Sequence, residues 1–116
     1  MPIKGSCHCG KVRYEADLDL GAGTGKCNCS ICAKRGALWA FGKPSQVKIL
    51  KGESALTDYQ FGKKRIHHLF CATCGIQSFA HGKGPGGAEM VAVNVRCLDG
   101  VEVDSLPVKK VDGRKF

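Results

Sequence analysis

Cysteine is the residue that most constrains how this chain can fold. Eight cysteines occur among 116 residues, and seven of them fall in tight clusters. Thiols separated by one or two residues are typical of metal binding, and in a reducing compartment this density favours metal over disulfides. The cysteines form three clusters and a single residue, namely Cys7 and Cys9; Cys27, Cys29 and Cys32; Cys71 and Cys74; and Cys97.

The remaining features of the chain fit a small protein of a reducing compartment. The N-terminal residues lack the apolar segment and cleavage pattern of a signal peptide, so we expect a cytoplasmic location. No apolar run approaches the roughly 20 residues that span a membrane. The length suits one compact domain, which we place at residues 1–116.

Two of the cysteine clusters can complete one metal site between them. Cys71 and Cys74 form a C-x2-C knuckle followed by Gly75, and a knuckle supplies only two of the four ligands that structural zinc requires. Cys7 and Cys9, followed by Gly10, offer the second pair. The spacing therefore predicts a closed, structural zinc site of four thiolates.

The third cluster, the trio of Cys27, Cys29 and Cys32, is left with its own three sulfurs. Catalytic zinc sites keep three protein ligands and an exchangeable fourth position, so we expect two zinc ions per chain, one structural and one catalytic at the trio. Two alternatives remain open. Cys97, His67 or His68 would close the trio into a second structural site, or the trio would hold an iron-sulfur cluster.

Short segments with alternating polar and apolar residues predict a mainly β fold with antiparallel strands. A helical turn is expected only after Cys29, with Ser30 as its cap and Gly36 at its end. The C-terminal tail contains Pro107 and is interpreted as an irregular cover over the sheet. The expected strands are residues 11–16, 46–50, 57–61, 65–70, 76–81 and 89–95, and residues 82–87 are expected to form a hairpin loop.

The order and spacing of the motifs resemble those of a known family across nearly the whole chain. The segments that carry the resemblance are GSCHCGKVRYEA, CNCSICAKRGALWAF, HLFCATCGIQSF, VNVRCLDGV and DGR. They are similar to the glutathione-dependent formaldehyde-activating enzyme family, which also includes centromere protein V. The resemblance implies a zinc-clipped β-tent, a structural zinc at Cys7, Cys9, Cys71 and Cys74, and a catalytic zinc at Cys27, Cys29 and Cys32. It also implies a carbon-sulfur lyase that joins glutathione and formaldehyde into S-hydroxymethylglutathione, with another thiol adduct as an admissible substrate.

The residue types around the trio fit that chemistry, because a three-thiolate zinc suits thiol activation. Lys34 and Arg35 would guide the carboxylates of glutathione, and Trp39 and Phe41 would wall the pocket. The alternative is that the two cations complement the helix dipole and the two aromatic residues belong to the sheet core. No proton acceptor is assigned among the four histidines, since His67 and His68 point to opposite faces of a strand. Asn94 and Arg96 resemble family positions of unassigned role.

The formal charge of +8 raises the possibility of a nucleic-acid partner. The basic residues are scattered, however, and only Lys63 to Arg65 and Lys109 with Lys110 form runs. The sequence indicates no aromatic platform for single strands beyond Tyr59 and Phe61. We therefore expect a small thiol partner, with a non-catalytic zinc module that binds nucleic acid or senses metal or redox state as the alternative. No oligomeric state is predicted.

Overall fold

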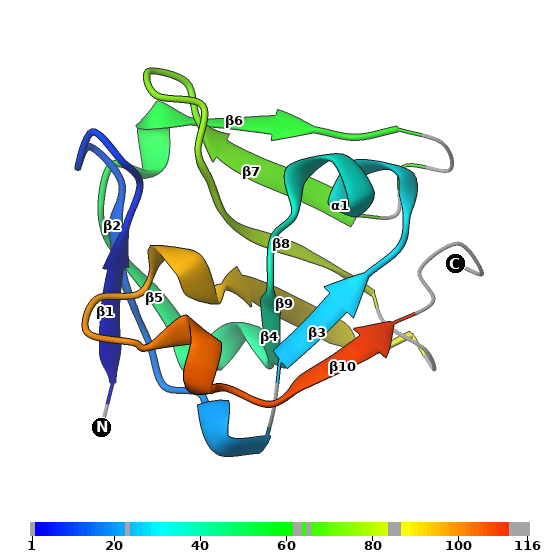
Figure 1. Ribbon diagram of the computed structural model, residues 1–116. Helices are drawn as coiled ribbons and strands as arrows, with labels where there is room; N and C mark the ends of the chain where they lie inside the picture. Colours follow the sequence, from blue (N-terminus) through cyan, green and yellow to red (C-terminus); the bar gives the residue numbers. More distant parts are fainter. Residues whose placement is uncertain (1, 23, 62–63, 65, 84–86, 112–116) are drawn as a thin grey trace.

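The computed structural model describes residues 2–22, 24–61, 64, 66–83 and 87–111 of the chain. Two β-sheets dominate the described part, accompanied by one short α-helix and several 3-10 turns (Figure 1). The small sheet has the order β1 (Ile3–Ser6), β2 (Arg13–Ala16), β5 (Val47–Lys51). The large sheet has the order β10 (Val108–Val111), β3 (Thr24–Cys27), β4 (Trp39–Gly42), β9 (Glu89–Asn94), β8 (Gln77–Lys83), β7 (Ile66–Cys71), β6 (Leu56–Tyr59).

The mainly β prediction is confirmed, and six strands lie where the alternating pattern placed them, shifted by at most a few residues. Strands β1, β3, β4 and β10 were not predicted. Their sequences, IKGS, TGKC, WAFG and VKKV, do not alternate polar and apolar residues. Residues 84–86 of the expected hairpin loop lie outside the described part, but β8 and β9 pair antiparallel up to Lys83 and Glu89.

The C-terminal tail was wrongly interpreted as an irregular cover. Pro107 does interrupt pairing, but the next four residues form β10, which pairs parallel to β3. This pairing is the exception to the expected antiparallel order among the described strands. It places Val111 opposite Cys27 and Lys110 opposite Lys26, so the tail runs beside the cysteine trio.

The predicted helical turn is α1 (Ser30–Arg35), and Gly36 ends it with a φ of 67° as expected. The cap prediction was wrong by one residue. Cys29 is the N-cap, and Ser30 is the first helical residue. Short helices in the described part of the chain include the 3-10 turns η1 (Leu20–Ala22), η2 (Pro44–Gln46), η3 (Glu53–Ala55), η5 (Val95–Cys97) and η6 (Val103–Ser105).

The core lies between the two sheets. Tyr14 of β2 is fully buried and packs edge-on against Phe79 of β8, with ring centroids 5.3 Å apart. Val93 and Val95 from the large sheet side and Val12 from the small sheet side complete it, and all three are fully buried. The small sheet thus covers one face of the large sheet, and α1 lies over the opposite face (Figure 1).

Candidate metal centres

Four sulfurs gather where the two sheets meet. Cys7 and Cys9 follow β1, while Cys71 ends β7 and Cys74 precedes β8. All four Sγ atoms lie within 4.8 Å of one another, with 3.6 Å between Cys7 and Cys9 and 3.7 Å between Cys9 and Cys71. A tetrahedral zinc with bonds of about 2.3 Å requires sulfur separations of about 3.8 Å, so this cluster fits the ion.

Backbone amides point at these sulfurs. The N–H of Val12 donates to the Sγ of Cys7 at 3.4 Å. Burial acts to raise the pKa of Cys74, but the N–H groups of Cys9 and Ile76 outweigh it and lower that pKa to about 6. Gly75 turns the chain with a φ of 80°, a conformation that glycine adopts without cost. The knuckle therefore presents its thiols in a setting that favours the thiolate, the form that binds metal.

The three sulfurs of the trio gather at the junction of β3 and α1. Cys27 ends β3, Cys29 caps the helix and Cys32 lies within it. Their Sγ atoms lie within 4.8 Å of one another, and the N–H of Cys29 donates to the Sγ of Cys27 at 3.5 Å. This junction therefore brings all three thiols to one point, as a three-ligand metal site requires.

Trp39 supports the trio from β4. Burial raises the pKa of the Cys32 thiol, and the indole N–H of Trp39 opposes that rise by donating a hydrogen bond to its sulfur. Burial also acts to raise the pKa of Cys29, but the amides of Cys32 and Ile31 contribute to lowering it. The tryptophan expected as a pocket wall is thus a buried side chain that contacts a trio ligand.

Among the described residues, no histidine, cysteine or carboxylate joins the trio as a fourth donor. Cys97 belongs to neither cluster. Its thiol instead donates to the carbonyl oxygen of Gln77 at 3.8 Å. All eight cysteines are free thiols. Cys97, one of the residues considered as a fourth ligand of the trio, therefore does not fill that position in this structure.

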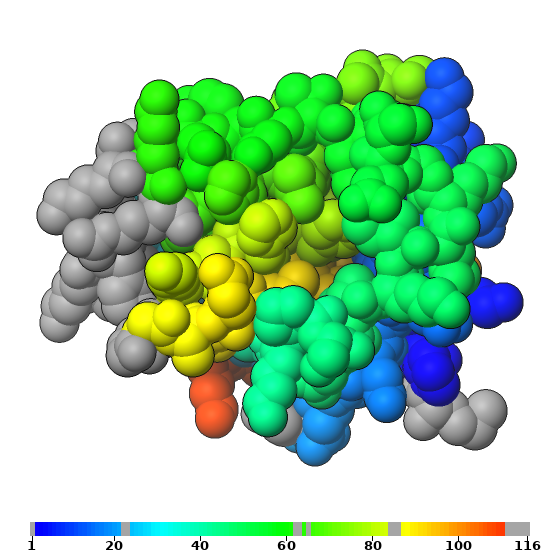
Figure 2. All heavy atoms as spheres, turned by 180° about the vertical axis from the view of Figure 1, so that it is seen from behind, coloured from blue at the N-terminus to red at the C-terminus, as the bar shows by residue number. Residues whose placement is uncertain are grey.

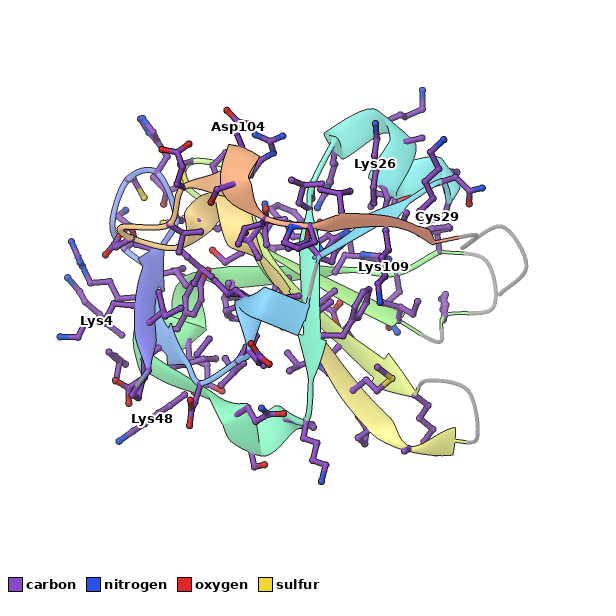
Figure 3. The ribbon with its side chains drawn as sticks, turned by 60° about the horizontal axis from the view of Figure 1, so that its bottom comes forward. Lys4, Lys26, Cys29, Lys48, Asp104 and Lys109 are labelled. Atoms are coloured by element: carbon purple, nitrogen blue, oxygen red, sulfur yellow. The ribbon has the colours of Figure 1, made fainter. Side chains whose placement is uncertain are left out.

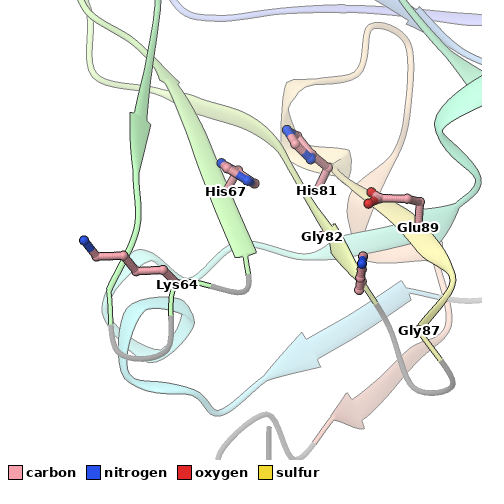
Figure 4. A pocket seen from close by; sticks show the side chains of 7 residues that line it. Lys64, His67, His81, Gly82, Gly87 and Glu89 are labelled. Atoms are coloured by element: carbon pink, nitrogen blue, oxygen red, sulfur yellow. The ribbon is translucent and has the colours of Figure 1, made fainter.

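Figure 2 shows the molecule from behind, with the green to yellow segments of β6, β7, β8 and β9 at the surface. His67 lies on the face of the large sheet away from the trio, because side chains alternate along β7 and its neighbour His68 lies on the trio face. The Nδ1 of His67 lies 2.5 Å from Asp58, and its ring stacks on His81 with centroids 4.6 Å apart. Both histidines line a hollow of about 520 Å³ (Figure 4), together with Lys64, Gly82, Lys83, Gly87 and Glu89. This hollow lies on the sheet face opposite α1, so neither His67 nor His81 reaches the trio.

His68 lies on the α1 face and is tied to the trio helix through Gln77. The guanidinium of Arg35 donates to Oε1 of Gln77, and Nε2 of Gln77 lies 3.4 Å from Nδ1 of His68. Arginine only donates, so the amide oxygen of Gln77 must face Arg35 and its NH2 must face His68. Nδ1 of His68 therefore accepts, and the imidazole proton resides on Nε2.

Arg35 is exposed in the last turn of α1, and its guanidinium has two contacts within the protein. Besides Gln77 it contacts the ring of Phe70, with its guanidinium carbon 5.7 Å from the ring centroid. Lys34 is exposed in the last turn of α1, as expected for a charge that complements the helix dipole. Asn94 has a structural contact, since its amide donates to the carbonyl of Gln77 at 3.0 Å.

A lysine that the sequence did not suggest lies on the trio side. In the register of β10 with β3, Lys109 is opposite Gly25 and therefore shares the sheet face of Cys27. Figure 3 shows Lys109, Lys26 and Cys29 on one side of the molecule, far from Lys4 and Lys48 of the small sheet. The sequence could not indicate this lysine, because Lys109 reaches the trio face only through the pairing of β10 with β3. Pro107 had argued against a strand in the tail.

Comparison with known proteins agrees with this arrangement. The profile of the family described as "glutathione-dependent formaldehyde-activating enzyme" matches residues 2–111. The chain belongs to this family. A similar solved structure is the crystal structure of a Rhodobacter sphaeroides protein, which is 37% identical, covers 91% of this chain and 99% of its own, and superimposes with a TM-score of 0.79.

Family membership accounts for the two cysteine clusters and the β-rich fold together. The described part of the chain contains no helix that is long and apolar enough to cross a membrane. The DGR motif expected near the C-terminus falls at residues 112–114, outside the described part.

Proposed function

We propose that this protein is a zinc-dependent carbon-sulfur lyase-type enzyme that joins a thiol to an aldehyde and cleaves the same adduct, with glutathione and formaldehyde as the reference pair. The observation that carries the proposal is the unequal division of the cysteines. Four sulfurs surround one point, whereas the trio has three sulfurs and no fourth donor among the described residues. A closed site stabilises the fold, and an open site can accept substrate.

In this proposal Cys7, Cys9, Cys71 and Cys74 hold the structural zinc, and Cys27, Cys29 and Cys32 hold the catalytic zinc. A zinc ion with three thiolates supplies activation of a coordinating thiol, because such thiols lose their proton near neutral pH. The protein's own residues fix the geometry. The amide of Cys29 and the indole of Trp39 hold two trio sulfurs by hydrogen bonds, so the three ligands stay converged.

The reaction is a reversible addition without change of oxidation state. A carbon-sulfur bond forms between the thiol sulfur and the carbonyl carbon, while the carbonyl π bond breaks. The proton released by the thiol is balanced by the proton that the carbonyl oxygen takes up. Lys109, on the face of Cys27, is placed to hold a carboxylate of a thiol such as glutathione by charge attraction.

The test measures adduct formation above the spontaneous reaction. Zinc-loaded protein, glutathione and carbon-13 formaldehyde are followed by NMR, and the rate of S-hydroxymethylglutathione formation is expected to exceed the uncatalysed rate. Cys29→Ser removes a trio sulfur and should reduce the rate to background. Cys97→Ser is the matched control, since this thiol belongs to neither cluster. Equal rates for wild type and Cys29→Ser would refute the proposal.

A further inference from the structure

The helix that carries part of the trio has no buried face. None of the six residues of α1 is buried, and no side chain caps its first turn. A helix of this length is not stable on its own in water. Its ends continue into the protein, since Cys27 ends β3 before it and Leu38 is buried after it, and the indole of Trp39 holds one sulfur. The helix itself, with the sulfurs of Cys29 and Cys32, needs a further contact to fix it on the sheet.

Arg35, in the last turn of α1, supplies that contact. Its guanidinium donates to Oε1 of Gln77, and its guanidinium carbon lies 5.7 Å from the centroid of the Phe70 ring. Phe70 of β7 and Gln77 of β8 are cross-strand partners, so Arg35 touches both members of one pair. Arg35 follows Cys32 by three residues, and positions three apart lie on the same side of a helix. This contact therefore holds the side of α1 that carries Cys32 (Figure 1).

Gln77 offers the guanidinium an acceptor in a fixed position. The residue is only 5% exposed. Its Nε2 donates to the carbonyl of Phe79 and to Nδ1 of His68, at 3.4 Å each, and its own carbonyl accepts from Asn94 at 3.0 Å. Because the NH2 group is engaged on one side, the amide oxygen is left to face Arg35. The acceptor is therefore part of the sheet and does not move freely on the surface.

The same two strands carry the knuckle between them. Phe70 directly precedes Cys71, and Gln77 follows Cys74 by three residues. The N–H of Gly75 donates to the carbonyl of Cys71 at 2.8 Å and closes the turn. We call β7, the knuckle and β8 the knuckle hairpin. A metal ion held by the four-sulfur cluster would stiffen this hairpin, and the guanidinium contact connects α1 to it.

We propose that Arg35 is a positioning residue of the trio: it fixes α1 on the knuckle hairpin and thereby keeps the sulfurs of Cys29 and Cys32 close to that of Cys27. The inference rests on the proposed function, because it explains how three ligands hold their geometry while a fourth position stays open. With three protein ligands in place of four, their convergence depends more on the surrounding protein. Groups that orient metal ligands from outside contribute a factor of about 10 to 100 in metal affinity.

Zinc affinity at the trio tests the inference without any substrate. Zinc-loaded protein is titrated with a chelator whose absorbance reports the zinc released, and Cys29→Ser identifies the release that belongs to the four-sulfur cluster. Arg35→Met removes the guanidinium from an exposed position. It should weaken zinc binding at the trio about tenfold, the effect of losing a hydrogen bond from a charged group, and leave the other zinc unchanged. Lys34→Met is the matched control, because it removes the same charge from the same turn.

Variants of Gln77 separate the contact from the charge. Gln77→Glu keeps an oxygen opposite Arg35 and should hold the zinc affinity of the trio within about twofold of wild type, whereas Gln77→Met should weaken it about tenfold. The double variant with Arg35→Met should be no weaker than Gln77→Met alone, because both changes remove one contact. Unchanged affinity in Arg35→Met, equal weakening in Lys34→Met, or additive losses in the double variant would overturn the inference.

Hydrogen exchange of the α1 amides needs no metal at the trio, so it separates this inference from the proposed function. The N–H groups of Ala33 and Gly36 donate to the carbonyls of Cys29 and Cys32, at 2.9 Å each. Once the chelator has removed zinc from the trio, both amides should exchange about tenfold faster in Arg35→Met than in wild type, while the amides of β7 keep their rates. Faster exchange supports the inference even if no adduct forms at the trio, and equal exchange overturns it.

Discussion

At the residue scale, the cysteines differ in the groups that surround each sulfur atom. Cys74 has a pKa of about 6 because backbone N–H groups outweigh its burial. Cys97 belongs to neither cluster, and burial, followed by the negative charges of Cys7 and Cys74, raises its pKa. Sequence spacing grouped the thiols within each motif, because ligands close in sequence are close in space, and the need for four ligands then paired Cys7 and Cys9 with Cys71 and Cys74. It could not place Cys97 or reveal Trp39 as a hydrogen-bond donor, since both depend on strand register.

Replacing one cysteine from each cluster should have different consequences. Cys29→Ser is expected to lose one of two zinc ions and remain folded, because the four-sulfur cluster still joins the sheets. Cys74→Ser is expected to fold poorly, because structural zinc contributes folding free energy directly. Elemental analysis gives the zinc content and circular dichroism the fold. Equal damage from both changes would contradict the division of roles, and Cys97→Ser should keep both zinc ions.

His68 should make the protein sensitive to acid. Burial and the charge of Arg35 lower its pKa in the folded state, whereas the pKa in the unfolded chain is about 6.5. As the pH falls through about 6.5, the unfolded chain takes up a proton that the folded chain resists, so stability falls. His68→Gln removes this dependence. Urea unfolding of zinc-loaded proteins at pH 8 and pH 6 should show a smaller loss for the variant, and an identical loss would contradict the assignment. His8→Gln, at an exposed position, serves as the control.

At the element scale, short strands and tight turns set the architecture. The sequence could predict α1, because a glycine stop and two terminal cations mark it. It could not predict β10, because a proline precedes it and its partner β3 lies about 80 residues earlier in the chain. Parallel pairing between such distant segments leaves no local signal. The same pairing brings Lys109 to the trio face, so the error about the tail was also an error about the site.

The turn after β5 depends on a glycine that packs tightly against the segment following Cys7 and Cys9. A Cβ at Gly52 would lie 1.9 Å from the carbonyl oxygen of Lys11, and its φ of 85° is already unfavourable for other residues. Gly52→Ala should therefore destabilise the protein by about 3 kcal/mol or more. Gly100→Ala, with a φ of 70° and no atom within 4 Å of the added Cβ, should cost only about 1 kcal/mol. Urea denaturation measures both, and equal costs would contradict the packing of this turn.

At the scale of the whole molecule, one cluster takes its cysteines from both sheets and the other from the large sheet and α1 alone. Cys7 and Cys9 extend from the small sheet, Cys71 and Cys74 from the large one, so a metal ion held by the four sulfurs would fasten the two layers. The trio belongs wholly to the large sheet and α1. Under the proposed function, losing a metal from the trio would leave the layers joined, so this cluster is free for chemistry.

The number of sulfur ligands per zinc tests the central claim most directly. X-ray absorption at the zinc edge, on protein loaded with two zinc ions, should give an average of about 3.5 sulfurs per zinc, because one site has four and the other three. Adding glutathione should raise the average to about 4 as its sulfur takes the open position. An average of 4 before glutathione is added, or an average that glutathione leaves unchanged, would contradict an open site at Cys27, Cys29 and Cys32.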